Sequence, residues 1–179
     1  MKNILKEIVG TSLYLLVVLA AAFLIITYVG QRTQVRGSSM ETTLQDKDNL
    51  IVDKISYRFR DPERFDIIVF PFQYEKNTYY IKRIIGLPGE TIQIDGQGNI
   101  YVNGEILEEH YGKERILYPG LAFEEIQLAD DEYFVLGDNR NNSSDSRDPS
   151  VGNIKRSKIT GRAWLRIYPF NKFGILQHQ

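Results

Sequence analysis

The chain has 179 residues, a length that suits one domain with a short appendage. Its 22 Lys and Arg nearly balance its 23 Asp and Glu, so a net charge of -1 offers no basic field of the kind that binds nucleic acid. The absence of cysteine excludes disulfides, thiolate metal sites and a cysteine nucleophile. With only two histidines, a His-based triad or a multi-His metal site is improbable.

The first predicted element is a membrane-spanning helix in the uncharged run Ile8–Val29. At about 1.5 Å per residue this run spans roughly 33 Å, enough for a hydrocarbon core of about 30 Å. A cleaved signal peptide is the alternative, but its apolar region is about 7–15 residues long and ends at small residues. Here Ala20–Ala22 lie mid-run and Phe23–Ile26 follow them. We therefore predict a retained anchor over 8–29 between a short segment 1–7 and a domain over 32–179. Basic residues flank both ends of the run and leave its orientation open.

The remainder of the chain is rich in short β-branched and aromatic segments separated by turn residues. Helical periodicity is weak, so the pattern predicts a mainly β fold, an antiparallel sheet or barrel-like domain. Asn103-Gly104 is a type I′ turn signal before a further short strand. Glu105–Glu125 is polar and irregular and predicts a variable insertion. The main predicted strands are 49–53, 65–70, 78–85, 91–95, 99–103, 132–137 and 160–168.

Two segments combine residues that suit nucleophilic catalysis. Gly37–Leu44 sets hydroxyls beside a glycine, which suits a tight turn that presents a nucleophile, although such clusters are mostly ordinary loops. Tyr80–Gly89 begins in a predicted strand, where alternation puts Lys82 on one face with Tyr80 and Ile84. This lysine is either partly buried or an edge-strand lysine that reaches solvent.

A third segment, Gly137–Asp148, is dense in short polar side chains directly after an apolar strand. It could be a solvated loop of Asx turns. A calcium loop that starts at Asp138 is excluded, because Arg140 occupies a ligand position and Pro149 stands where the bidentate glutamate belongs.

The three segments in this order resemble the type I signal peptidases, membrane-anchored serine proteases that cut signal peptides from exported preproteins. Ser39–Leu44 resembles the family motif Ser-Met-x-Pro-Thr-Leu, and Tyr80–Gly89 resembles Tyr-x-Lys-Arg-x-x-Gly-x-Pro-Gly. Gly137–Arg147 resembles Gly-Asp-Asn-Arg-x-x-Ser-x-Asp-Ser-Arg. The resemblance covers nearly the whole chain. It implies a β-rich catalytic domain on the extracytoplasmic side of the cell membrane, behind one transmembrane helix whose N-terminus is cytoplasmic.

The resemblance also implies roles for individual residues. Ser39 is expected to be the nucleophile, with its backbone N–H as an oxyanion donor, and Lys82 the general base. Ser143 is expected to hydrogen-bond and orient the lysine, while Asp145 and Arg147 hold the loop. A free lysine has a pKa of about 10.4, so the base needs burial to lower its pKa, and a nearby carboxylate would oppose this. We therefore expect Arg147 to hold Asp145 away from Lys82.

The implied substrate is a signal peptide with small residues, typically Ala, one and three positions before the cut. Such a peptide would bind in extended form along strand edges. The lipid bilayer is the other expected partner, and no nucleic acid, metal or cofactor is predicted. Met40 is equally interpretable as a core residue. The residues expected to contact the substrate are Gln34, Val35, Arg36, Met40, Tyr79, Tyr80 and Ile81.

Two positions depart from the family pattern. Gly37 lacks the hydroxyl that some members place two residues before the nucleophile, and Thr42 occupies the proline position of the motif, where proline would stiffen the turn. The alternative function is a catalytically weak or silent, membrane-tethered chaperone or assembly factor on the same fold. A self-cleaving repressor-type protease fits less well, because those are usually tied to a DNA-binding domain, whereas a transmembrane segment stands at the front of this chain.

Overall fold

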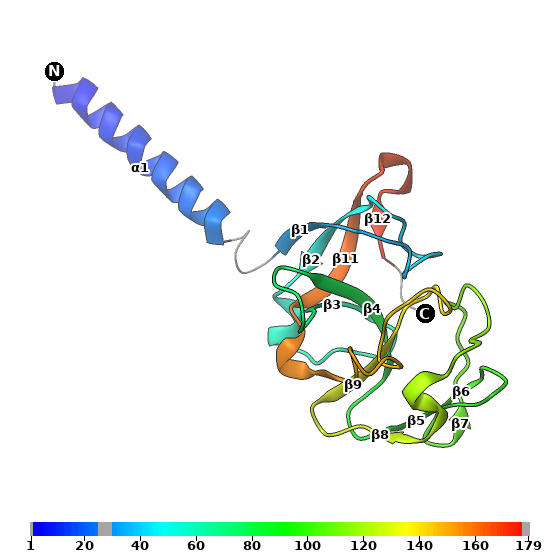
Figure 1. Ribbon diagram of the computed structural model, residues 1–179. Coiled ribbons are helices and arrows are strands. Elements are labelled where there is room, and N and C mark those ends of the chain that lie inside the picture. The colour runs from blue at the N-terminus through cyan, green and yellow to red at the C-terminus, as the bar shows by residue number, and fades with distance from the viewer. Residues whose placement is uncertain (1, 25–29, 177–179) are drawn as a thin grey trace.

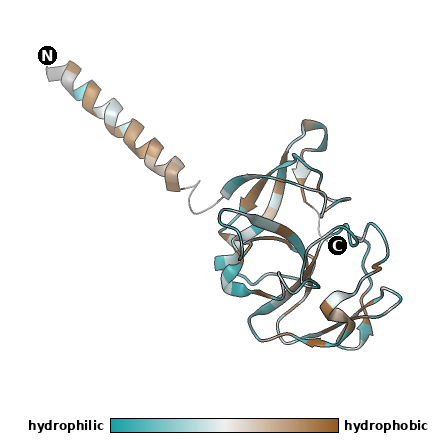
Figure 2. Ribbon diagram, viewed as in Figure 1, coloured by the Kyte–Doolittle hydropathy of each residue, from teal (hydrophilic) through white to brown (hydrophobic). Residues whose placement is uncertain are grey.

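The computed structural model describes residues 2–24 and 30–176, with one helix ahead of a β-rich domain (Figure 1). Helix α1 spans Lys2–Leu24. Its stretch Lys6–Leu24 has a mean hydropathy of 2.1, and none of it is buried within the protein. Figure 2 shows apolar residues along most of α1. A helix this apolar that packs against no part of the described domain fits a lipid environment.

The helix differs from the predicted segment at its N-terminal end. Residues 2–7 continue the helix, although the sequence analysis placed them in a separate terminal segment. No proline or glycine precedes Gly10, so nothing in the local sequence ends the helix there. Residues 25–29 of the predicted span lie outside the described residues.

The larger of the two sheets within residues 30–176 forms the body of the domain. It has eight strands, all paired antiparallel, in the order β1-β2-β11-β3-β4-β9-β10, with β12 paired to β11. The strands are β1 (Gly30–Gln34), β2 (Asn49–Asp53), β3 (Ile67–Pro71), β4 (Tyr79–Gly86), β9 (Glu132–Leu136), β10 (Ile154–Lys155), β11 (Gly161–Tyr168) and β12 (Gly174–Ile175).

The smaller sheet has four antiparallel strands in the order β7-β6-β5-β8. These are β5 (Thr91–Ile94), β6 (Ile100–Val102), β7 (Glu105–Ile106) and β8 (Ile126–Gln127). Short 3-10 helices complete the fold at Ser56–Arg58, Gly120–Phe123, Arg156–Lys158 and Phe170–Lys172.

The predicted fold class is confirmed, and each main predicted strand is present within two residues of its predicted ends. Strand β7 follows the predicted turn at Asn103-Gly104, and the insertion that it opens is otherwise irregular except for one 3-10 helix. Four described strands, β1, β8, β10 and β12, were not predicted. Strand β1 also starts the domain two residues before the predicted boundary. Its sequence Gly-Gln-Arg-Thr-Gln has no apolar alternation, so backbone pairing with β2 defines it.

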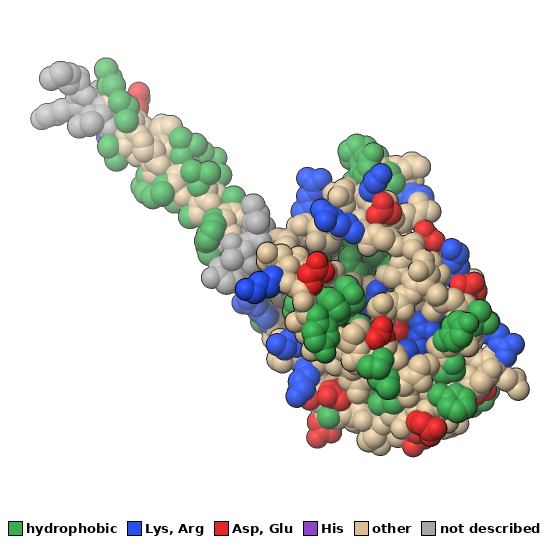
Figure 3. Space-filling view, in the orientation of Figure 1, with side chains coloured by type: hydrophobic (Ala, Val, Ile, Leu, Met, Phe, Trp, Pro, Cys, Tyr) green, Lys and Arg blue, Asp and Glu red, His purple; other side chains and the backbone are tan. Residues whose placement is uncertain are grey.

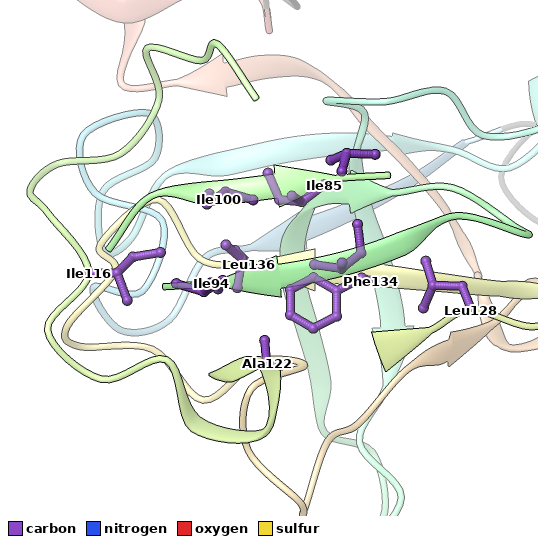
Figure 4. Packing of buried hydrophobic residues seen from close by; sticks show 10 residues of the cluster. Ile85, Ile94, Ile100, Ile116, Ala122, Leu128, Phe134 and Leu136 are labelled. Carbon is purple, nitrogen blue, oxygen red and sulfur yellow. The ribbon is translucent and has the colours of Figure 1, made fainter. Parts of the chain in front are cut away.

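Among the described residues, the core consists of three apolar clusters that meet at β4. Ile84 packs in one cluster with residues such as Ile68, and Ile85 packs in another between the two sheets, so β4 is buried on both faces. Figure 4 shows the Phe134 ring lying among the side chains of that second cluster. A third cluster, which includes Leu50, lies beneath the segment that follows β1. In contrast to the apolar core, the surface carries interspersed acidic and basic side chains on the face of the domain shown in Figure 3.

We predict that Phe134→Ala lowers the free energy of unfolding by about 3–5 kcal/mol, because the fully buried ring leaves a cavity between the sheets. Denaturant unfolding of the full chain in detergent, followed through its single tryptophan, measures this. Phe123→Ala is the matched control, since that ring is 56% exposed, and it should change the free energy by less than about 0.5 kcal/mol. Equal losses in both variants would contradict the packing assigned to Phe134.

Candidate active site

The turn that carries Ser39 follows β1 directly. Gly37 has a φ of 85°, in the left-handed region that favours glycine, and its N–H donates to the Asp46 carboxylate over 2.9 Å. Behind the serine, Met40 and Leu44 are buried in the core beneath the turn. The turn is therefore anchored by apolar side chains on its inner side, while Ser39 stays at the surface of a cleft.

Lys82 lies near the middle of β4, paired with Ile68 of β3. Its side chain is only 4% exposed, and its Nζ donates a hydrogen bond to Ser39 Oγ over 2.7 Å. The two residues come from separate segments of the chain, so it is the fold that brings them together. The predicted nucleophile and base are thus in direct contact.

Burial is the main influence on the Lys82 amine. It lowers the pKa of Lys82 to about 8, because the charged form loses its hydration in the interior. The carboxylates of Asp145 and Asp138 act in the opposite direction and raise this pKa, whereas the Arg147 guanidinium lowers it. Asp145 is therefore near enough to act on Lys82, contrary to the expectation that it is kept away, but its effect is smaller than that of burial.

The loop Gly137–Arg147 is closed by an ion pair at its end. Arg147 Nε and Nη2 each donate to the Asp145 carboxylate over 2.8 Å, and Asp145 also accepts from the Gly137 N–H over 3.0 Å. The same guanidinium donates to the carbonyls of Arg140 and Tyr118. Arg147 thus binds Asp145, its own loop and the insertion at once.

Ser143 does not make the hydrogen bond that the resemblance implied. Its hydroxyl is buried with no hydrogen-bond partner among the described residues, and Lys82 donates to Ser39 instead. The Ser143 hydroxyl packs against Gly137, where an added Cβ would collide with it and with the Ser39 carbonyl. The serine therefore fills space behind the nucleophile turn, and the expected bond to the lysine is a correction to the sequence analysis.

The sequence analysis gave no role to a buried cluster on the other face of β4. Arg83 is fully buried; its Nε and Nη2 donate to the Asp138 carboxylate over 2.9 and 2.8 Å, and its Nη1 donates to the Phe65 carbonyl. Thr43 Oγ1 donates to the same carboxylate over 2.5 Å. Strand alternation indicated that Arg83 faces away from Lys82, but nothing in the pattern showed that Asp138 would meet it.

A cleft of about 600 Å³ opens beside Ser39 and Lys82. It runs between the end of β1 and the start of β4, and Asn77, Asn142 and Ser144 lie along it. Met40 lines the cleft and also belongs to the core cluster, so its interpretation as a core residue is confirmed and its contact with substrate stays a prediction. All seven residues expected to contact substrate line this cleft: Gln34, Val35, Arg36, Met40, Tyr79, Tyr80 and Ile81.

Fold and site together define a class: a β-sheet protein with an apolar N-terminal helix and a serine–lysine pair at the base of a cleft. The family model described as signal peptidase, peptidase S26, matches residues 7–168. The chain belongs to this family of peptidases.

Individual relatives carry the same description. The chain is 44% identical over 172 residues to a probable signal peptidase I-2 of Synechocystis sp., covering 93% of this chain and 75% of that one. It is 37% identical over 166 residues to the signal peptidase I P of Bacillus subtilis subsp. natto, covering 88% of each. A crystal structure of a signal peptidase I from Enterococcus faecalis V583 is 35% identical, covers 57% of this chain and 97% of that one, and has a TM-score of 0.47.

We predict a pH dependence of stability that originates at Lys82. The unfolded lysine has a pKa of about 10.4 and the folded one about 8, so between these values the unfolded chain binds a proton that the folded chain lacks. Relative to Lys82→Met, the free energy of unfolding of the wild type should therefore rise by about 3 kcal/mol as the pH increases from about 7 to 11. Denaturant titrations of both proteins across this range measure the difference. A difference that stays flat would contradict the buried, weakly basic amine.

Proposed function

We propose that this protein is a membrane-anchored serine endopeptidase that removes N-terminal signal peptides from exported preproteins, with Ser39 as nucleophile and Lys82 as general base. One observation carries the proposal: a buried lysine of lowered pKa lies 2.7 Å from a serine hydroxyl at a cleft. Membership of the signal peptidase family supports it. A silent scaffold would have no need of a buried lysine held against a serine, because burying the amine costs stability.

The lowered pKa makes Lys82 an available base at neutral pH. With a pKa of about 8, about one amine in ten is uncharged at pH 7, against about one in 2,500 for a free lysine. The uncharged Nζ accepts the proton of the Ser39 hydroxyl as Oγ attacks the scissile carbonyl. A new C–O bond forms, and the carbonyl electron pair moves onto its oxygen.

The tetrahedral intermediate then collapses. The C–N bond breaks, the Lys82 ammonium gives its proton to the leaving amine, and the mature protein departs with a new N-terminus. The signal peptide remains as an ester on Ser39. Water attacks this ester while Lys82 accepts a proton from it, and Ser39 Oγ recovers that proton as the signal peptide leaves as a carboxylic acid.

The charges around Ser39 and Lys82 influence the rate of cleavage. An oxyanion develops on the scissile carbonyl, and the Ser39 backbone N–H is its donor. Asp145 would hold the lysine protonated if it acted alone, because a carboxylate favours the ammonium form. Arg147 offsets it by binding both carboxylate oxygens. Asp145 and Arg147 therefore support the site without touching the reacting atoms.

Two free strand edges suit an extended substrate. Strand β1 pairs only with β2, so its other edge is unpaired among the described strands. On β4, pairing with β9 begins at Arg83, which leaves Tyr79–Lys82 open on that side. A peptide that adds to these edges would lie along the cleft and bring its carbonyl to Ser39. We propose that the cleft takes small side chains, typically Ala, one and three positions before the cut.

The anchor and the site imply a topology. Ser39 follows α1 after only one short strand, so the cut is made close to the bilayer surface. Signal peptides are removed on the side to which preproteins are exported. We propose that the N-terminus is cytoplasmic and that the domain lies on the extracytoplasmic side of the cell membrane, with signal peptides and the lipid bilayer as partners.

We predict that Ser39→Ala and Lys82→Ala each reduce cleavage of a preprotein to background, since each removes one partner of the proton transfer. Gel assays of the full chain in lipid vesicles, with a preprotein that carries an Ala-x-Ala site, measure this. Ser157→Ala and Lys155→Ala are the matched controls, because both residues are exposed on the surface, and both variants should cleave like the wild type. Full cleavage by Ser39→Ala would overturn the assignment of the nucleophile.

We predict that an impermeant maleimide labels intact cells at Glu63→Cys but not at Asn3→Cys. The chain has no cysteine of its own, so each variant reports one site. The Glu63 side chain is 73% exposed on the domain, whereas position 3 precedes the apolar span. Asn3→Cys should react only after the membrane is permeabilised. The reverse pattern of labelling would show the opposite topology.

A further inference from the structure

Asn139, in the loop that follows β9, makes hydrogen bonds to the backbone on both sides of the Ser39 Cα. The Asn139 N–H donates to the Ser39 carbonyl over 3.0 Å. The Asn139 side-chain amide donates to the Ser38 carbonyl over 3.1 Å. Asn139 is only 4% exposed and does not line the cleft, so this contact lies behind the turn. The proton transfer between Ser39 and Lys82 makes no use of it.

The contact with the Ser38 carbonyl determines the direction of the Ser39 N–H. The Ser38 carbonyl and the Ser39 N–H belong to one planar peptide unit, which is trans here. In such a unit the carbonyl and the N–H point in opposite directions. Since the carbonyl points at Asn139, behind the turn, the N–H points away from Asn139 toward the side where Ser39 lines the cleft.

The Ser39 N–H is also left free for a ligand. It donates to no acceptor among the residues that the structure describes, whereas the Ser38 carbonyl accepts two hydrogen bonds, from the Asn139 side chain and from the Glu41 N–H over 3.1 Å. Donation to a carbonyl polarises its peptide unit and strengthens the N–H of that unit as a donor. Gly37 has no side-chain hydroxyl that could donate to an oxyanion, so stabilisation of the oxyanion depends more on the Ser39 N–H.

We propose that Asn139 is a positioning residue: its side-chain amide fixes the Ser38–Ser39 peptide so that the Ser39 N–H faces the cleft and binds the oxyanion of the tetrahedral intermediate. The inference rests on the proposed peptidase function. It assigns Asn139 no contact with substrate and no part in proton transfer. Its effect is confined to the state in which negative charge has developed on the carbonyl oxygen.

The chain offers a matched control two positions further along. The Asn141 side chain also makes two hydrogen bonds, accepting from the Leu117 N–H and donating to the Arg115 carbonyl, both over 2.9 Å. These bonds tie the loop to the insertion and do not reach the nucleophile turn. Asn139→Ala and Asn141→Ala therefore remove the same side chain from the same loop at different places.

The test is steady-state cleavage of the preprotein by the full chain in vesicles, with active enzyme counted by a serine-reactive probe. Loss of a whole oxyanion donor reduces kcat by about 10²–10³-fold, and a released peptide loses only part of its orientation. Asn139→Ala should therefore reduce kcat by about 10–100-fold, with KM within about threefold of the wild type. The acid limb of its pH profile should stay near pH 8, because Lys82 keeps its burial. Asn141→Ala should match the wild type.

A second measurement distinguishes a misoriented Ser39 N–H from a general loss of structure at the active site. A peptide aldehyde forms a tetrahedral adduct on Ser39 whose oxyanion needs the same donor, so its affinity for Asn139→Ala should fall by the same factor as kcat. Binding of a signal peptide that ends at the cut site in a carboxamide, which carries no negative charge on its carbonyl oxygen, should not change. Asn139→Leu keeps the branched shape of the side chain and adds no charge but removes the donor, and it supplies the same test if the alanine variant does not fold.

Three results would overturn the inference: full kcat in Asn139→Ala, unchanged aldehyde affinity in that variant, or an equal loss in Asn141→Ala. Each differs from failure of the peptidase proposal, which would show as cleavage that survives Ser39→Ala.

Discussion

The removal of one lysine side chain from water is the constraint on which the rest of this structure depends. Lys82 is buried in β4, and burial brings its pKa to about 8 while its Nζ contacts the Ser39 hydroxyl. An ammonium in bulk water would be a poor base at neutral pH. The loss of hydration that makes the lysine useful also destabilises the fold, because the charged form is the more stable one in solvent. The packing of the rest of the domain must therefore offset this loss of stability.

Strand β4 carries two adjacent buried cations that the fold treats in opposite ways. Arg83 faces one side and meets the Asp138 carboxylate through two of its nitrogens, so its charge is retained and neutralised. Lys82 faces the other side, where no carboxylate lies within ion-pair distance among the described residues, and its nearest polar partner is a neutral hydroxyl. Asp145 stays bound to Arg147 instead. The arginine thus fixes the architecture, while the lysine without an acidic partner keeps its capacity to exchange a proton.

The nucleophile turn shows how a loop can hold an exposed side chain in place. Below the turn, Met40 and Leu44 enter the core. Behind it, Asn139 donates hydrogen bonds to the carbonyls of Ser38 and Ser39, which flank the Ser39 Cα. Ser143, which the resemblance placed against the lysine, packs under Gly137 instead. Support from below and behind leaves the cleft side of the turn free. This division explains how Ser39 remains accessible while its backbone is fixed.

Features that depend on the local order of residues could be predicted before the structure was known. Apolar length indicated the anchor and β-branched segments indicated the main strands, whereas Ser39 and Lys82 were assigned through the resemblance of three short motifs to the signal peptidase family. Strand β1 was missed because its polar sequence forms a strand only by pairing with β2. The tertiary structure alone decided which distant groups meet: the 2.7 Å contact, the burial that lowers the lysine pKa, the missing Ser143 bond and the Asn139 contact behind the turn. Pattern fixes which way a side chain points from its own strand, whereas distances between segments far apart in the chain arise only when the sheets pack.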